Sequence, residues 1–167
     1  SGLPERTYAE VTQFFERGLE LFDSVMFIAG NHDVHHDLTD VIPRGVVVAG
    51  IEPQTIRAGH WALHTAAVEI DRDPRTIVPF PGAREGVPNL GLLHSSVTGE
   101  HSNHACMPCT VDELTACNYD AWLLGHVHER VVLSTDPFIG WVSMGKALIA
   151  SVDGGRVTIS DALELRA

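Results

Sequence analysis

The feature that most constrains the fold is an apolar run at residues 25–29 (Val-Met-Phe-Ile-Ala), which is closed by Gly30 and followed at once by three polar residues. A short apolar run that ends in glycine predicts a buried strand of a parallel sheet. Asn31, His32 and Asp33 would then lie past the carboxyl end of that strand, where open α/β sheets bind ligands. An amide oxygen and an imidazole can hold a metal, and a carboxylate can orient an imidazole. A simple turn without a binding function would explain these three polar residues equally well.

Two later segments repeat this design and favour the site over the turn. The apolar residues 90–94 end in His94, and the apolar residues 121–125 are followed by His126 and His128. If the last segment stays extended, the side chains of His126 and His128 point the same way, because side chains alternate along a strand. The glycine before His126 would leave room for an approaching ion. Together the segments predict a metal site at one edge of the sheet.

The composition is that of an ordinary globular domain. Of the 167 residues, 44% are hydrophobic and 20% are charged, which is typical of one domain with a sizeable core. No apolar run approaches the roughly 20 residues that span a membrane, and no signal peptide is visible. Three cysteines do not indicate a disulfide framework. We therefore expect a single domain, residues 1–167, in the cytoplasm and with no membrane partner.

The charge balance bears on the substrate. Twenty-two acidic residues against eleven basic ones give a formal charge of −11, whereas proteins that hold DNA by its phosphates usually carry a basic patch. A bound divalent metal reverses the sign of the charge locally, so the acidity does not exclude a phosphodiester substrate. It does argue against tight unaided binding to long duplex DNA.

In the order of its motifs the chain resembles the calcineurin-like metallophosphoesterases. The motifs are Gly-Asn-His-Asp at residues 30–33, the strand-end His94, and Gly-His-Val-His at residues 125–128. Three further segments look like the SbcD-type DNA-repair exonuclease branch of that family, residues 91–99, 108–114 and 119–130.

The resemblance implies an α/β fold, a β-sandwich flanked by helices in four α-β-β-α layers, around a dinuclear metal centre. Two ions about 3.5–4 Å apart would activate a water and clamp the phosphate. Mn²⁺ is the first expectation, with Fe or Zn²⁺ as alternatives, because mixed nitrogen and oxygen ligands suit these metals better than Mg²⁺. By resemblance, Asn31, His94 and His126 would hold one ion, and His128 would belong to the other.

The resemblance also implies two catalytic residues. His32 would not be a ligand; it would stabilise the transition state or protonate the leaving oxygen, and Asp33 would orient it.

The chain departs from this family on its N-terminal side. Members carry an Asp-x-His and a Gly-Asp-x-x-Asp motif before Gly-Asn-His-Asp, and neither occurs in the 29 residues before Gly30. We therefore expect this chain to be the C-terminal portion of a metallophosphoesterase domain, without its first two β-α units and with half a metal centre. The other ligands would come from a missing N-terminal segment or a partner chain.

Three functions remain open. The first is exonuclease-like hydrolysis of DNA phosphodiesters. The second is hydrolysis of small phosphoesters or nucleotides, which matches the acidity better. The third is a truncated, inactive binding module. The nuclease branch usually has a Pro-Gly-Asn type loop after its Gly-His-x-His motif, whereas this chain has Gly-Trp-Val-Ser-Met-Gly at residues 140–145.

A second metal hypothesis concerns the loop at residues 98–110. His101, His104, Cys106 and Cys109 resemble a zinc ligand set, and the two cysteines have zinc-knuckle spacing. A second Cys-x-x-Cys is absent, and the family resemblance places a Pro-Cys here without a structural metal, so we do not expect zinc.

The remaining patterns predict secondary structure. Capping boxes at residues 7–10 and 110–113 predict two helices, the first packing on the sheet. Residues 71–89 are expected to form a long surface loop in which Arg75 is solvated or contacts phosphate. His60 and His64 are expected to be structural or exposed. Further strands are expected at residues 46–49, 62–68, 131–133, 139–142, 147–152 and 157–160, the last two joined by a hairpin turn at residues 153–155.

Overall fold

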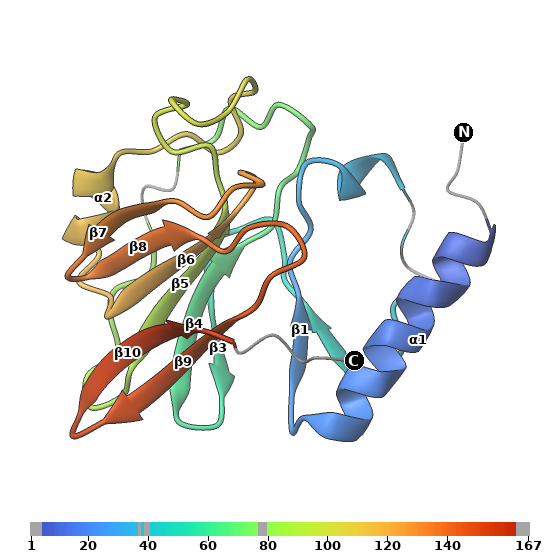
Figure 1. The fold of residues 1–167 in the computed structure, drawn as a ribbon, viewed down its shortest axis with the longest axis horizontal. Helices are drawn as coiled ribbons and strands as arrows, with labels where there is room; N and C mark the ends of the chain where they lie inside the picture. The colour runs from blue at the N-terminus through green and yellow to red at the C-terminus, as the bar shows by residue number, and fades with distance from the viewer. Residues whose placement is uncertain (1–4, 37, 39–40, 77–79, 163–167) are drawn as a thin grey trace.

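A computed structural model of the chain describes residues 5–36, 38, 41–76 and 80–162 (Figure 1). The helices in this range are α1 (Glu5–Leu21), the short 3-10 helix η1 (Asp33–His35) and α2 (Val111–Ala116). The strands are β1 (Val25–Phe27), β2 (Val46–Val48), β3 (Gln54–Ala58), β4 (Trp61–Ala66), β5 (Asn89–His94), β6 (Ala121–Gly125), β7 (Val132–Thr135), β8 (Phe138–Trp141), β9 (Leu148–Asp153) and β10 (Arg156–Asp161). None of the described helices is long and apolar enough to cross a membrane.

The centre of the molecule is a six-stranded sheet in the order β3-β4-β5-β6-β8-β7. Strands β4, β5, β6 and β8 run parallel, and β3 and β7 pair antiparallel at the two edges. In the central pair, His94 at the end of β5 lies opposite Gly125 at the end of β6. The residue that follows each of these strands is therefore delivered to the same edge of the sheet.

Buried aromatic side chains hold these central strands in place. The indole nitrogen of Trp122 donates to the carbonyl of Leu114 in α2 at 2.9 Å, and neither side chain is exposed. Gly91 of β5 makes room for this indole, because a Cβ at Gly91 would lie 2.1 Å from its ring. Trp141 of β8 is also buried and donates to the carbonyl of Ser95, just after β5. The core thus fixes the carboxyl ends of β5 and β6.

Strands β1 and β2 form a separate two-stranded parallel sheet beside α1 (Figure 1). Phe15 of α1 packs edge-on against Phe27 of β1, with their ring centroids 5.7 Å apart. The chain just after β4 joins the two sheets: the Ala67 amide donates to the Gly50 carbonyl at 2.8 Å, and the Val68 amide donates to Ala29 at 3.1 Å. These two hydrogen bonds set the end of β1 against the six-stranded sheet.

The expected α/β class agrees with the structure, which has a central multi-stranded sheet, and the four-layer arrangement stays a prediction. The prediction for the first strand is partly wrong. The parallel pairing of β1 is present, whereas the strand covers only Val25–Phe27, is half-buried, and lies outside the sheet of β5 and β6. A two-stranded sheet supplies few neighbours to bury it, and Val48 on the paired strand is 53% exposed.

The two capping boxes had different outcomes. The second is confirmed: the Thr110 hydroxyl accepts from the Glu113 amide, and the Glu113 carboxylate accepts from the Thr110 amide. The first is wrong, because α1 already begins at Glu5 and Thr7 lies inside it. The Glu10 carboxylate pairs with Arg6, one turn away, at 2.9 Å.

The remaining strand predictions agree with the structure within about two residues, as expected for element boundaries. The hairpin of β9 and β10 is confirmed as an antiparallel pair. Strand β3 was not expected, and β8 pairs parallel with β6 as well as antiparallel with β7. Between β4 and β5, the described residues of the expected loop at 71–89 contain no helix or strand before Asn89.

His64 is a structural residue, which was one of the two interpretations expected for it. Its side chain is fully buried and stacks on Tyr119, with centroids 4.0 Å apart. Its Nδ1 lies 2.9 Å from the Thr55 hydroxyl, and its Nε2 lies 2.8 Å from the side-chain oxygen of Asn89. Burial lowers the pKa of His64, with the Asn89 hydrogen bond opposing and Arg84 adding to the shift.

This burial predicts a loss of stability in mild acid. Below pH about 6.5 the unfolded chain protonates His64 while the folded chain resists, so the unfolded state binds more protons and the free energy of unfolding falls. Chemical denaturation measured from pH 7.5 down to pH 5 will show a flatter pH dependence in His64→Gln than in the wild type. The variant His60→Gln, at an exposed position, is the control and will keep the wild-type slope. Equal slopes in all three proteins would contradict the assignment.

Candidate metal centre

Three of the expected ligands meet at one point of the structure. The Asn31 Oδ1 atom lies 2.8 Å from His94 Nε2 and 3.3 Å from His126 Nδ1, and the two imidazole nitrogens are 3.3 Å apart. Asn31 follows β1, His94 ends β5, and His126 follows β6. Three segments that are distant in the sequence therefore present three donor atoms within hydrogen-bonding distance of one another.

These separations fit a bound divalent ion. Nitrogen and oxygen ligands lie about 2.0–2.2 Å from a first-row metal, so adjacent donors on one ion are about 2.8–3.6 Å apart. The three measured distances fall in this range. Two imidazoles and an amide oxygen also suit Mn²⁺, Fe and Zn²⁺ chemically. The residues thus fit the group that the sequence motifs imply.

His126 has the outer hydrogen bonds of a typical metal ligand. While Nδ1 faces Asn31 and His94, Nε2 lies 2.7 Å from the Ser102 hydroxyl and 3.0 Å from the His104 carbonyl. Metal-binding histidines usually give their second ring N–H to such a partner, which sets the tautomer and the ring orientation. Burial lowers the pKa of His126, although the His104 carbonyl opposes the shift.

The backbone at His126 differs from the sequence-based expectation. Strand β6 ends at Gly125, and His126 has φ +97°, so the Gly-His-Val-His segment is not extended. A non-glycine residue in this sparsely populated region costs about 1–3 kcal/mol and is concentrated at functional sites. His126 and His128 still line the same pocket, but the chain brings them there by a sharp turn and not by strand alternation.

His94 is held in a tight cradle of glycines. A Cβ at Gly30 would lie 2.5 Å from its ring, and a Cβ at Gly125 would lie 2.9 Å from its Nδ1. Gly125 was expected to clear the way for an ion, and the structure shows that it clears space for the imidazole. Burial, followed by the charges of the neighbouring histidines, lowers the pKa of His94 to about 4. The ring is therefore neutral at pH 7, as a metal ligand must be.

Asp71 orients the third ligand, and the sequence had not singled it out. The Asn31 side-chain NH₂ donates to Asp71 Oδ1 at 2.9 Å, which turns the Asn31 oxygen toward the two imidazoles. This hydrogen bond is the main reason why the pKa of Asp71 is lowered. Asp71 also lies 3.8 Å from His35. No spacing rule indicates the residue, because it lies in an irregular loop 40 positions after Asn31.

The site opens into a small pocket of about 200 Å³. Its walls come from the three ligand segments and from the chain after β8, namely Asn31, His32, His94, Leu124, Gly125, His126, Val127, His128, Val142, Ser143 and Met144. His32 and His128 therefore face the same space as the candidate ligands, although both are exposed. Their charges contribute to the lowered pKa of His94.

Asp33 is placed differently from the expectation. Its carboxylate accepts a hydrogen bond from the Gly30 amide at 2.7 Å, and this closes the turn that carries Asn31. Among the described residues Asp33 makes no hydrogen bond to His32, so the expected orienting contact is not formed. The carboxylate instead stabilises the backbone of the motif.

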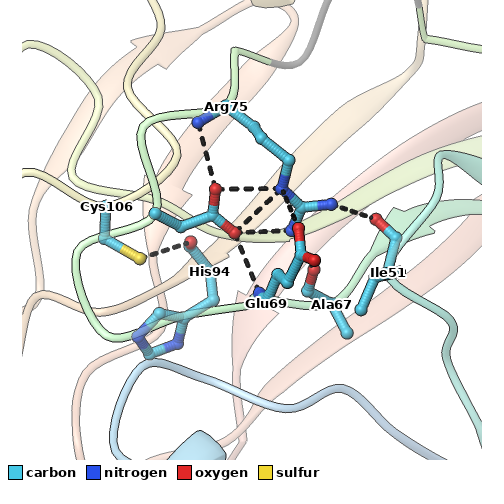
Figure 2. Close-up of polar contacts among 7 residues, drawn as sticks. Ile51, Ala67, Glu69, Arg75, His94 and Cys106 are labelled. Atoms are coloured by element: carbon cyan, nitrogen blue, oxygen red, sulfur yellow. Dashed lines mark hydrogen bonds and ion pairs between the residues drawn. The ribbon is translucent and has the colours of Figure 1, made fainter.

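An ion pair between the half-buried Arg75 and a buried aspartate supports the loop behind the site. It corrects the interpretation of Arg75 as a solvated or phosphate-binding cation. Arg75 donates to both carboxylate oxygens of Asp73, which is 1% exposed, and to the carbonyls of Ile51 and Ala67 (Figure 2). Burial works to raise the pKa of Asp73, but the hydrogen bonds from Arg75 and the backbone lower it overall. The Asp73 carbonyl also accepts from the Met107 amide.

The zinc set considered for residues 98–110 does not form. Cys109 lies 3.5 Å from the Ser95 hydroxyl, and His101 packs against Trp141. A different cluster is close enough to share an ion. Among the histidine, cysteine and acidic side chains that the structure describes, it consists of His94, Cys106 and His126.

Comparison with known proteins agrees with the superfamily that the motifs indicate. The "Uncharacterized metallophosphoesterase YhaO" of Bacillus subtilis (strain 168) is 38% identical over 48 residues. These residues are 29% of this chain and 12% of that protein, so the match spans only a small part of either. No family model and no solved structure matches the chain. The match supports the metallophosphoesterase superfamily and a divalent metal, and it does not distinguish the SbcD-type branch.

The glycine cradle predicts that Gly30→Ala will impair metal binding. The added Cβ would push the His94 ring away from Asn31, and disturbing ligand orientation costs about 10–100-fold in metal affinity. Isothermal titration with Zn²⁺ and Mn²⁺ measures the effect. Gly82→Ala is the matched control, because a Cβ at Gly82 meets nothing within 4 Å. Equal affinity in the two variants would contradict the role of the cradle.

The Asn31–Asp71 hydrogen bond predicts opposite outcomes for two substitutions. Asp71→Ala frees the Asn31 amide to rotate and will weaken metal binding by about 10–100-fold. Asp71→Asn keeps an acceptor for the Asn31 NH₂ and will retain most of the affinity. If both variants lose affinity equally, the negative charge of Asp71 matters and its hydrogen bond does not.

Proposed function

We propose that this chain is the C-terminal portion of a metallophosphoesterase domain and that it hydrolyses phosphodiesters at the centre formed by Asn31, His94 and His126. The observation that carries the proposal is the convergence of these three donors at separations of 2.8–3.3 Å. The match to a metallophosphoesterase points to the same class of reaction.

The residues divide the chemistry among themselves. When bound, a divalent ion would neutralise charge on the phosphoryl oxygens. It would also lower the pKa of a water, so that the water loses a proton and can act as the nucleophile. Asn31, His94 and His126 would hold that ion, while His128 would contribute to a second one. His32, exposed at the rim of the same pocket, would donate a proton to the leaving oxygen. Asp33 would keep the turn that positions Asn31 and His32.

The pocket limits what part of the substrate is enclosed. Sites that enclose a whole small ligand measure about 300–1,000 Å³, and this pocket has about 200 Å³. It accommodates a phosphoryl group and its nearest atoms, so the rest of the substrate would lie on the surface. DNA, cleaved from an end, is the substrate class that the resemblance to the SbcD-type branch favours. The net charge of −11 favours small phosphoesters or nucleotides as the second candidate.

The centre is proposed to be half of a dinuclear site. In the described residues the donors around Asn31 account for one ion, and His128 belongs to no group of three or more histidine, cysteine or acidic side chains at ligand distance. We therefore expect the purified chain to retain at most one ion and to hydrolyse slowly until the remaining ligands are supplied. Two tightly bound ions per chain, measured by elemental analysis after dialysis, would contradict this part of the proposal.

Hydrolysis assays test the function. Single-stranded DNA and a small chromogenic phosphodiester are offered in parallel with Mn²⁺ or Zn²⁺. We expect slow, metal-dependent hydrolysis that His126→Ala abolishes. His32→Ala will lower the rate by about 10²–10⁴-fold, the usual contribution of a general acid, with unchanged metal content.

His60→Ala is the matched control for these variants, because His60 is an exposed histidine in the turn between β3 and β4. Hydrolysis of DNA alone supports the nuclease, and hydrolysis of the small substrate alone supports the second candidate. Activity that survives His126→Ala, or activity on neither substrate at any metal concentration, would contradict the proposal. The second result would favour a binding module.

A further inference from the structure

A buried thiol lies beside the proposed ligands. Cys106 is fully buried, and its sulfur and one ring nitrogen each of His94 and His126 lie within 4.8 Å of one another. Figure 2 shows the Cys106 sulfur directed at the backbone of His94. Its hydrogen bond to the His94 carbonyl is 3.8 Å long, which is a weak interaction for a thiol. The sulfur is therefore near the site without being tightly engaged elsewhere.

A second cysteine of the same loop provides a comparison. Cys109 is 5% exposed, and burial raises the pKa of both thiols to about 11. The Cys109 sulfur, however, lies 3.5 Å from the Ser95 hydroxyl and does not belong to the cluster with His94 and His126. Burial is thus common to both residues, whereas proximity to the two imidazoles is specific to Cys106.

The packing behind the site fixes where this sulfur is. The Cys106 amide donates to the Ser96 hydroxyl at 3.1 Å, and the next amide, of Met107, donates to the carbonyl of the buried Asp73 at 2.7 Å. Asp73 is in turn clamped by Arg75. Cys106 does not line the open pocket, so its sulfur approaches the imidazoles from the protein interior and leaves the pocket side free for water or substrate.

We propose that Cys106 is a further ligand of this centre, so that His94, His126 and Cys106, with Asn31, form a mixed nitrogen, oxygen and sulfur site selective for Zn²⁺ over Mn²⁺. The inference rests on the proposed function, because it concerns the same ion. On binding, the S–H bond breaks, the electron pair of sulfur forms the bond to the metal, and the proton leaves to solvent. Rotation about the Cα–Cβ bond of Cys106 would have to bring the sulfur closer to the two ring nitrogens. Thiolate ligands favour zinc, whereas Mn²⁺ prefers oxygen ligands.

Cobalt substitution tests the assignment independently of hydrolysis. Co²⁺ is titrated into the metal-free purified chain, and its visible d–d bands report binding while a near-ultraviolet band reports thiolate-to-cobalt charge transfer. The wild type will show both. Cys106→Ser will lose the charge-transfer band and will bind Zn²⁺ more weakly, by at least the about 10–100-fold that loss of an outer-shell partner costs. Cys109→Ser is the matched control and will keep both features.

Each outcome separates this inference from the proposed function. Visible bands without charge transfer in the wild type would overturn the role of Cys106 and leave the Asn31–His94–His126 site in place. Absence of any cobalt spectrum would overturn both. If Cys106→Ser does not fold, the double variant Cys109→Ser/Cys117→Ser decides, because Cys106 is then the sole cysteine of the chain: a charge-transfer band supports the proposal, and its absence overturns it.

Discussion

The junction between the two sheets is the constraint on which the rest of the structure depends. The amides of Ala67 and Val68, just after β4, donate to the carbonyls of Gly50 and Ala29, and these hydrogen bonds set the end of β1 against the six-stranded sheet. Without this junction Asn31 would not lie beside His94, because β1 does not pair with any strand of the six-stranded sheet. The candidate site is therefore a property of how two sheets are joined, and not of one sheet edge.

Around this junction, the surroundings of the ligands orient each of them before any ion binds. Asp71 turns the amide of Asn31, the His104 carbonyl and the Ser102 hydroxyl hold one side of His126, and two glycines cradle His94. Such outer contacts reduce the reorganisation that metal binding requires and tune the affinity of the site. The Asp73–Arg75 ion pair supports the same region from behind. Asp71 lies two residues before Asp73, and the segment that carries Cys106 bonds to the Asp73 carbonyl through the Met107 amide.

The proposed function depends on charge as much as on geometry. A chain with a net charge of −11 repels phosphates unless a cation intervenes, and the neutral imidazoles of His94 and His126 are in the form that accepts one. The lowered pKa of His94 arises chiefly from burial, so the same packing that builds the core also keeps the ligand ready. Under the proposed function, a divalent ion bound at this point would invert the local charge where a phosphoryl group would enter the pocket.

Local patterns in the sequence determined the elements and the candidate ligands: apolar runs ending in glycine and histidine predicted the strands, and the motif order pointed to Asn31, His94 and His126. The reason is that side-chain period and chain punctuation are local properties. Tertiary structure alone decided the separate sheet of β1, the turn at His126 and the pairing of Arg75 with the buried Asp73. It also decided the contacts of Asp71 and Cys106. Both residues lie in irregular loops, and their partners are 40 and 12 positions away. No local pattern encodes which loop folds over which strand end.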